Sequence, residues 1–228
     1  MNSLVYGVTR WLARHALVPL YARLTVVGVE NVPLQGPLVI ASNHLNDADP
    51  GIITACMPRP VAFMAKAELF RIPVFSLYLR LFGSFPVNRG RADLSSLRRA
   101  TDALARGLAV CIFPEGTREG PAAALMEAWP GAGLVALRSN APVLPIAITG
   151  TGEMSIRYLL LHPLRRRRVT VTIGIPFRLP RAERLDAETA REGTRIIMER
   201  IAALLPQENR GYYGYVTTGA GHAPGLEE

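Results

Sequence analysis

Short apolar runs alternate with amphipathic stretches along most of the 228 residues, and this alternation limits the folds open to the chain. The runs are rich in valine and isoleucine and are bounded by glycine, proline or asparagine, which predicts strands. The stretches between them repeat apolar residues at three- and four-residue steps, which predicts helices. We expect strands at residues 23–33, 36–41, 61–65, 108–113, 141–150 and 168–177, and helices at 51–57, 93–106, 131–140 and 187–205. The sequence therefore predicts an α/β domain.

Length and composition place most of the chain in one folded unit. Apolar residues make up 49% of the sequence, which excludes disorder over most of its length. We predict a single domain over residues 29–206, preceded by an amphipathic helix over residues 1–28. The segment 207–228 is rich in glycine and tyrosine, and we expect it to form a loose tail.

Arginines interrupt the apolar N-terminal segment, and two interpretations fit this pattern. In the first, the segment is a membrane-docking helix, with Trp11 and Tyr21 at headgroup depth and with Arg10 and Arg14 reaching lipid phosphates. In the second, it is an ordinary helix that packs on the domain and kinks at Pro19. No stretch reaches the roughly 18 uncharged apolar residues of a membrane-spanning helix, so we expect none.

The chain is strongly basic, with a formal net charge of +8, and arginine carries nearly all of it because Lys66 is the only lysine. Such a surface suits nucleic acid, anionic lipid or phosphorylated small molecules, and charge alone does not choose among them. The run Arg165–Arg168 fits these partners or a solvated loop, but it lacks the aromatic residues and recognition helix typical of nucleic-acid binding. Cys56 and Cys111 stand in apolar surroundings without Cys-x-x-Cys spacing, which predicts buried free thiols and no zinc–thiolate site.

Residues 43–50, NHLNDADP, follow an apolar run and combine one histidine with two aspartates. The carboxylate of Asp49 could fold back against the His44 imidazole, fix its tautomer and stabilise the imidazolium that forms on taking a proton. Alternatively, Asp49 is a plain helix N-cap before Pro50, and His44 bonds to backbone. A metal site of His44, Asp47 and Asp49 is a third interpretation, although no further His or Cys ligand is evident. A phosphatase-type Asp-x-Asp pair fits poorly, because the chain has one lysine and no Asp-Asp.

Two later stretches suit contacts to phosphate. FGSFPVNRG places Arg89 at the end of an extended stretch, and arginine binds phosphate through two N–H groups at once. CIFPEGTREG ends a buried strand at a proline, after which come Glu115, Gly116, Thr117 and Arg118. A carboxylate beside a flexible glycine and a cation suits recognition of a polar head with hydroxyls and phosphate. The same string also fits a turn with a solvent-facing ion pair.

Taken together, these stretches resemble the glycerolipid acyltransferase family of the PlsC type. The shared order is His-x4-Asp, Gly…Asn-Arg, FPEGTR and VLPIAI, over roughly Val32 to Gly152. FPEGTR about 70 residues after NH-x4-D is a specific combination, whereas neither half is specific alone. The segment AKAELFRIPVF also resembles the family's linking segment and places Lys66 at the position of a recurrent lysine.

The resemblance implies a mixed, mostly parallel sheet flanked by helices, with an N-terminal membrane-docking segment. It implies that His44, oriented by Asp49, is the general base for an acceptor hydroxyl, which attacks an acyl thioester directly. Lys66 or a backbone amide is expected to stabilise the oxyanion. The family requires no metal or organic cofactor. The residues that match its acceptor-binding motifs, with the arginines on phosphate, are Arg89, Glu115, Gly116, Thr117 and Arg118.

The predicted function is that of a 1-acylglycerol-3-phosphate acyltransferase, which makes phosphatidic acid from lysophosphatidic acid with acyl-CoA or acyl-acyl-carrier protein as donor. We expect a peripheral protein on the anionic cytoplasmic face of the cell membrane, with no nucleic-acid partner. Asn88 stands where the family commonly has an acidic residue, and Glu119 and WPGAG follow FPEGTR. Because of these departures, glycerol-3-phosphate or a lyso-aminolipid remains open as acceptor. The alternative of another class is a non-catalytic basic module that docks on anionic membranes.

Overall fold

A computed structural model describes residues 3–81, 84–87, 94–116, 124–152, 154, 166–182 and 184–215. Within these residues seven strands form one sheet in the order β1-β7-β6-β2-β5-β3-β4. Every neighbouring pair is parallel except β6 and β7, so β1 and β7 run against the other five strands. The mixed, mostly parallel sheet is thereby confirmed. The strands are β1 Ala22–Val27, β2 Leu38–Ser42, β3 Val61–Lys66, β4 Phe85–Val87, β5 Ala109–Ile112, β6 Val143–Thr149 and β7 Arg167–Ile173.

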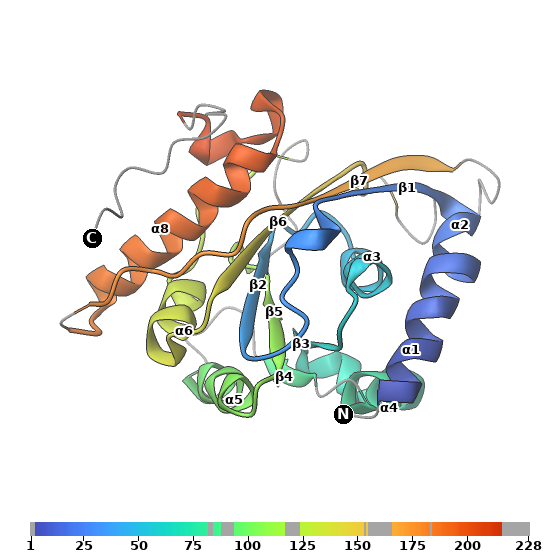
Figure 1. Cartoon of the computed structure of the whole chain (residues 1–228), viewed down its shortest axis with the longest axis horizontal. Coiled ribbons are helices and arrows are strands. Elements are labelled where there is room, and N and C mark those ends of the chain that lie inside the picture. The colour runs from blue at the N-terminus through green and yellow to red at the C-terminus, as the bar shows by residue number, and fades with distance from the viewer. Residues whose placement is uncertain are drawn as a thin grey trace.

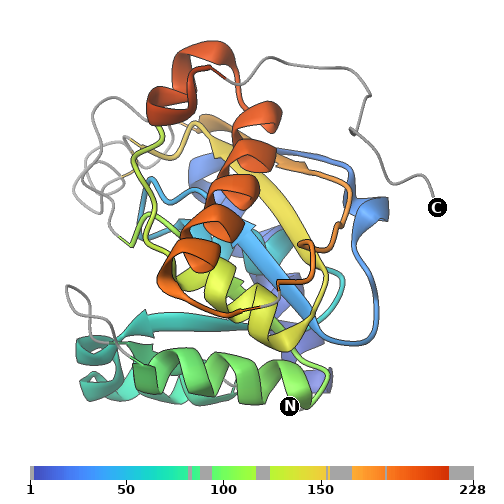
Figure 2. The same cartoon turned by 90° about the vertical axis from the view of Figure 1, so that its left-hand side faces the viewer.

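Helices cover both faces of this sheet (Figure 1). One face carries α3 (Asp49–Cys56) and, outside it, the N-terminal helical segment, which consists of α1 (Ser3–Leu12), the π-helix η1 (Ala13–Leu17) and α2 (Val18–Tyr21). The other face carries α5 (Leu94–Ala105), α6 (Gly131–Ser139) and α8 (Ala187–Leu204), and Figure 2 shows α6 and α8 in front of the strands. The remaining helices, η2 (Val29–Asn31), η3 (Ala67–Arg71), α4 (Pro73–Leu81), η5 (Gln207–Asn209) and η6 (Gly211–Tyr213), are short or lie at the rim.

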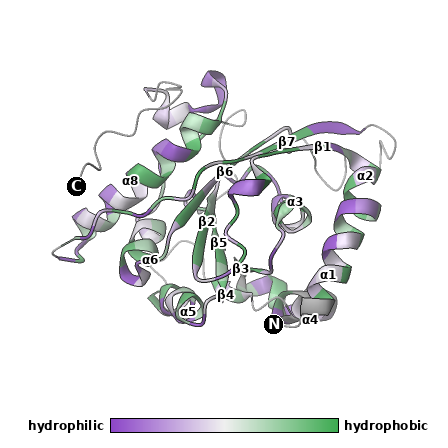
Figure 3. Ribbon diagram, viewed as in Figure 1, coloured by the Kyte–Doolittle hydropathy of each residue, from purple (hydrophilic) through white to green (hydrophobic). Residues whose placement is uncertain are grey.

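The central strands are apolar on both faces, as strands covered by helices on each side must be. Alternate residues therefore enter two cores: Ile40 and Cys111 pack on the α3 side, whereas Val39 and Val110 pack on the α5–α6–α8 side. Figure 3 shows these strands as mostly hydrophobic, while the outer helices mix both characters. The alternating pattern of the sequence predicted all of these strands except β4, together with α3, α5, α6 and α8, and the α/β fold is confirmed.

The N-terminal helical segment is shorter than the predicted helix over residues 1–28. It ends at Tyr21, because Ala22–Val27 forms β1 and pairs with β7. Its inner face packs on α3, where the Tyr6 hydroxyl donates to the carbonyl of Met57 at 3.2 Å. Tyr21, which we expected at headgroup depth, instead packs against the core, whereas Trp11 is 60% exposed.

The π-helix sets which side chains of this segment face the core. Ala13 and Val18 are both buried although they are five positions apart, which is the spacing of a π turn rather than an α turn. Pro19 follows at once and lacks the N–H that would continue an α-helical ladder from His15. A π turn therefore lies just before Pro19, where the second interpretation of the sequence predicted a kink.

The C-terminal end of the domain differs from the predicted loose tail over 207–228. Residues 207–213 form the 3₁₀ turns η5 and η6, and both Arg210 and Tyr213 are buried. The Arg210 guanidinium donates from Nε and Nη2 to the carbonyl of Leu205, at 3.1 and 3.0 Å, and so ties this segment to the end of α8. Residues 216–228 lie outside the described residues.

Candidate active site

The candidate site lies at the carboxyl ends of the neighbouring strands β2 and β5, where open α/β sheets place their ligands. β2 ends at Ser42 and leads into Asn43 and His44. The Asn43 side chain extends the pairing of β2 with β6, because its Nδ2 donates to the Ile148 carbonyl at 2.9 Å and its Oδ1 accepts from the Ile148 N–H at 2.8 Å. The residue before His44 is thus fixed to the sheet. Sequence reasoning missed this role, although an asparagine directly after a buried strand must find partners.

His44 and Asp49 meet as the spacing predicted. Nδ1 of His44 lies 2.9 Å from Oδ2 of Asp49, which also accepts the backbone N–H groups of Leu45 and Asn46, each at 2.7 Å. Asp49 is fully buried, so these three donors compensate a charge that water does not reach. The acidic partner of the histidine is therefore held in one position.

The helix start differs from the predicted N-cap. Asp49 is the first residue of α3, and Ala48 is the N-cap without a side-chain hydrogen bond. The Asp49 carboxylate turns back onto the loop before the helix rather than onto the helix itself. Its position at the helix start therefore leaves the carboxylate to hold His44, so the cap and the dyad are not competing roles.

The imidazole of His44 is positioned by ring stacking as well as by its hydrogen bond to Asp49. It stacks on Phe113 with ring centroids 4.1 Å apart and planes 19° from parallel, and His44 is only 5% exposed. Phe113 directly follows β5, so the β2–β5 pairing brings the two rings together. Because the Asp49 carboxylate accepts at Nδ1, the proton belongs on Nδ1 and the Nε2 lone pair is free to take a proton. This arrangement suits general-base chemistry.

Glu115 faces the backbone of the loop that carries His44. Its Oε1 accepts the N–H of His44 at 3.2 Å and its Oε2 accepts the N–H of Met126 at 2.9 Å, and the residue is 4% exposed. Burial raises the pKa of Glu115 to about 7; the two N–H groups oppose this shift and the charge of Asp49 adds to it. Both oxygens are engaged by backbone amides, so acceptor binding by this carboxylate stays a prediction.

Gly116 ends the described part of this turn in a conformation that suits glycine, with φ of +67°. An added Cβ would lie 3.1 Å from Cδ1 of Trp129, whose backbone N–H donates to the Pro114 carbonyl at 2.9 Å. The indole therefore packs closely against the turn, and it would have to shift slightly to admit a side chain at position 116. Trp129 is a neighbour of the site that its motif position did not reveal.

The strands β3, β4 and β5 end at the same edge of the sheet as β2, and the other predicted site residues stand at the end of β3 or come after β4 and β5 in the sequence. Lys66 is the last residue of β3, and its side chain lies outside the described residues. Arg89, Thr117 and Arg118 also lie outside them. Their roles in acceptor binding and charge stabilisation stay predictions.

The metal interpretation gains no support from the geometry. Among the described residues, no group of three or more His, Cys, Asp or Glu side chains could hold a metal ion. Asp47 is exposed, whereas Asp49 is buried and occupied by three donors. The expected absence of any cofactor stays a prediction.

Comparison with known proteins decides the family. The family model described as Acyltransferase matches residues 23–149, more than half of the chain and all of the sheet from β1 to β6. The chain belongs to the acyltransferase family. The match stops before β7 and α8, so these elements and the C-terminal turns lie beyond the family model.

Several relatives of this acyltransferase-family chain carry the name 1-acyl-sn-glycerol-3-phosphate acyltransferase. The relative from Bacillus subtilis is 30% identical over 81% of this chain and 92% of its own length. Those from Chlamydomonas reinhardtii and Borreliella burgdorferi are 32% and 29% identical over 66% and 62% of this chain. The chain spans 48% and 61% of the lengths of these last two relatives.

A solved structure supports the fold. The crystal structure of the 1-acyl-sn-glycerophosphate acyltransferase PlsC from Thermotoga maritima superimposes with a TM-score of 0.69, at 24% identity over 88% of this chain and 80% of that one. This likeness extends beyond the residues of the family model. It shows that the same fold continues through the later part of the chain.

Proposed function

We propose that this acyltransferase-family chain moves a fatty acyl group from acyl-CoA or acyl-acyl-carrier protein to the free hydroxyl of lysophosphatidic acid, giving phosphatidic acid. The observation that carries the proposal is the buried His44–Asp49 pair, 2.9 Å apart at the carboxyl edge of the sheet. The names of the relatives supply the acceptor. Glycerol-3-phosphate and a lyso-aminolipid are the other acceptors to be tested.

In the proposed reaction, Nε2 of His44 removes the proton of the acceptor hydroxyl while the oxygen of that hydroxyl attacks the thioester carbonyl carbon. The Asp49 carboxylate stabilises the imidazolium that results. The tetrahedral intermediate then collapses, the carbon–sulfur bond breaks, and the leaving thiolate takes the proton from His44. A positioned general base of this kind contributes about 10²- to 10⁴-fold to the rate.

Phosphate recognition is assigned to arginine in this proposal. Arg89 and Arg118 are placed on the acceptor phosphate, because a guanidinium binds two phosphate oxygens at once. Gly116 and Thr117 are also assigned to acceptor binding in this proposal. Lys66, or a backbone amide, is placed at the oxygen that becomes negative during attack.

The test is acyl transfer by the full chain and by His44→Ala, with labelled acyl-CoA and a panel of the three acceptors, read by product mass. We expect labelled phosphatidic acid from the wild type and loss of transfer in His44→Ala. His15→Ala is the matched control, since this histidine is exposed on η1. Transfer at the wild-type rate by His44→Ala would refute the assignment of the base. Binding to anionic vesicles without transfer to any acceptor would instead support the non-catalytic module.

We also propose that the protein docks on the cytoplasmic face of the membrane through an apolar face of the N-terminal helical segment. Among the described residues, no helix is long and apolar enough to cross a membrane. The side chains of the face share high exposure on α1, η1 and α2, and they are Val8, Trp11, Leu12, Leu17 and Leu20. Exposed Arg14 lies on the same segment and suits anionic headgroups.

Docking is tested by co-sedimentation with anionic vesicles. The double variant Trp11→Ser, Leu17→Ser should lose most of its vesicle binding, because both side chains are exposed and apolar. Leu34→Ser is the control, since Leu34 is exposed to a similar degree but lies just before β2. Equal binding by the double variant and the control would contradict this docking face.

A further inference from the structure

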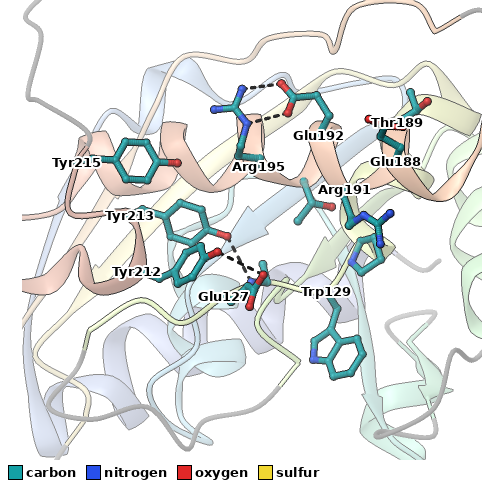
Figure 4. Close-up of a pocket in the computed structure, with 13 residues that line it drawn as sticks. Glu127, Trp129, Glu188, Thr189, Arg191, Glu192, Arg195, Tyr212, Tyr213 and Tyr215 are labelled. Atoms are coloured by element: carbon teal, nitrogen blue, oxygen red, sulfur yellow. Dashed lines mark hydrogen bonds and ion pairs between the residues drawn. The ribbon is translucent and has the colours of Figure 1, made fainter.

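The C-terminal segment 207–213 lies against residues 124–130, which come after the turn at Phe113–Gly116. Three hydrogen bonds from backbone N–H groups join the two segments, and a fourth runs from the Tyr212 hydroxyl to the Glu127 carboxylate at 3.4 Å. The N–H of Leu125 donates to the Asn209 carbonyl at 3.0 Å, the N–H of Tyr212 donates to the Leu125 carbonyl at 2.9 Å, and the N–H of Ala128 donates to the Tyr213 hydroxyl at 3.3 Å. Figure 4 shows the Tyr212 and Tyr213 side chains directed toward the segment that carries Glu127 and Trp129.

Residues 124–130 in turn hold the turn at the candidate site. The N–H of Met126 donates to Oε2 of Glu115, and the N–H of Trp129 donates to the Pro114 carbonyl, each at 2.9 Å. The other oxygen of Glu115 accepts the N–H of His44. The peptide group between Leu125 and Met126 therefore connects the C-terminal segment to His44, because its carbonyl accepts from Tyr212 and its N–H donates to Glu115, which in turn accepts the N–H of His44.

The contact between the two segments is close enough to exclude any side chain at its centre. Gly211 has φ of +46°, and a Cβ there would lie 2.2 Å from the Leu125 carbonyl oxygen and 2.8 Å from the Leu125 nitrogen. Tyr213, two residues later, is 3% exposed. A sequence with alanine at 211 could not keep both hydrogen bonds of Leu125 without a shift of the backbone.

We propose that the C-terminal segment 207–213 is a positioning element for His44. The segment positions Met126 so that the Met126 N–H donates to Glu115, and Glu115 in turn accepts the backbone N–H of His44. The proposal rests on the proposed function only in its kinetic readout, since it assigns no contact with substrate to Gly211 or Tyr213. Loss of the contacts between segment 207–213 and residues 124–130 would displace the imidazole from the position in which it can take the acceptor proton. A displacement of about 1 Å costs up to about 100-fold in rate.

The experiment compares Gly211→Ala with Gly107→Ala in the full chain. Gly107 has a similar conformation, with φ of +75°, but a Cβ there meets nothing within 4 Å. It precedes β5 and so lies at the opposite edge of the sheet from His44. Gly107→Ala therefore reproduces the backbone strain of a left-handed alanine without disturbing the C-terminal segment.

Two readouts are measured on both variants after circular dichroism has confirmed folding. The first is kcat for acyl transfer to lysophosphatidic acid, which should fall about 10- to 100-fold in Gly211→Ala with the KM for acyl-CoA within about twofold. The second is hydrogen exchange at the His44 amide, read by mass spectrometry on peptides that contain it, which should speed up in Gly211→Ala alone. A kcat equal to that of Gly107→Ala, or unchanged exchange at His44, would overturn the proposal.

The exchange readout separates this proposal from the proposed function. If the wild type transfers no acyl group, the proposed function fails, while exchange at His44 still tests the positioning element. The double variant Glu115→Gln, Gly211→Ala adds a further check, because substitutions on one path should not multiply their effects on kcat. Fully multiplicative losses would contradict a shared path.

A milder pair covers the case in which Gly211→Ala does not fold. Tyr213→Phe removes the hydroxyl that accepts from Ala128, whereas Tyr212→Phe removes an exposed hydroxyl bonded to Glu127 at 3.4 Å. We expect faster exchange at His44 and a several-fold lower kcat in Tyr213→Phe only. Equal behaviour of these neighbouring variants would count against the segment's role.

Discussion

Glu115 should make the stability of this protein depend on pH in a way that one substitution removes. Burial raises the pKa of its carboxyl group to about 7, from 4.5 for an exposed glutamate. Because the pKa is higher in the folded state than in the unfolded state, folding favours the neutral form. The contribution of Glu115 to the free energy of unfolding is therefore fully present below about pH 4.5 and is lost as the pH rises through about 7.

The magnitude follows from the two pKa values and the burial of the group. The gap of about 2.5 pH units, at about 1.36 kcal/mol per unit, corresponds to about 3 kcal/mol in the free energy of unfolding. Glu115 is 4% exposed, so solvent screening reduces this figure little. In Glu115→Gln the group no longer titrates, and the wild type should lose about 3 kcal/mol relative to the variant between about pH 4.5 and about pH 8.

The assay is urea unfolding across this pH range, followed by tryptophan fluorescence. Trp129, which packs against the turn at Gly116, provides a fluorescence signal close to Glu115. Glu30→Gln is the control, since Glu30 is exposed on η2, and its pH dependence should follow that of the wild type. The reasoning is refuted if the unfolding free energies of wild type and Glu115→Gln stay parallel across the range.

Three further predictions concern other parts of the molecule. Asp49→Asn should lower kcat by about 10³-fold or more, because a neutral amide does not compensate the charge of the imidazolium that forms on His44. Asp47→Asn, at an exposed site, should retain activity in the same assay. The two buried cysteines should react with a thiol reagent only after unfolding, since burial raises the pKa of the Cys56 thiol to about 12; fast labelling of the native protein would contradict this. Gly133→Ala should lower the free energy of unfolding by about 1–3 kcal/mol in urea titrations, because its methyl would lie 2.3 Å from a backbone oxygen of α8. Gly7→Ala, whose methyl would meet nothing within 4 Å, should leave the free energy of unfolding unchanged.

The elements of the fold could be predicted because their signals are local. The run at 36–41 is apolar throughout, as a strand buried on both faces must be, and the helix over 187–205 shows its buried stripe in the spacing of Ile197 and Ile201. The order of the strands could not be read in the same way, since β1 pairs with β7 across about 145 residues of chain. The first strand was predicted to run to residue 33, but Gly28 turns the chain with φ of +79° and ends it early.

The dyad could be predicted because His44 lies just after a strand and Asp49 begins the next helix, so five positions of chain bring them together. The surroundings of the dyad depend on distant segments and left little local signal. Asn43 is held by hydrogen bonds to Ile148 on β6, and the stacking of Phe113 on His44 depends on the pairing of β2 with β5. The ordered turns after α8 were missed for the same reason, because a glycine- and tyrosine-rich sequence shows no period and its partners lie near Leu125.

The one antiparallel pairing in the sheet, between β6 and β7, has a consequence for how a lipid would reach the site. It reverses β1, so the amino end of β1 lies at the same edge as the carboxyl end of β2. The proposed docking segment, which ends at Tyr21, therefore arrives beside the reacting edge and not at its far side. β1 and β2 are three strand spacings apart, since β7 and β6 lie between them, and at about 4.8 Å per spacing this amounts to about 14 Å. Docking through this segment would therefore bring the membrane surface to the edge of the sheet that carries the His44 loop.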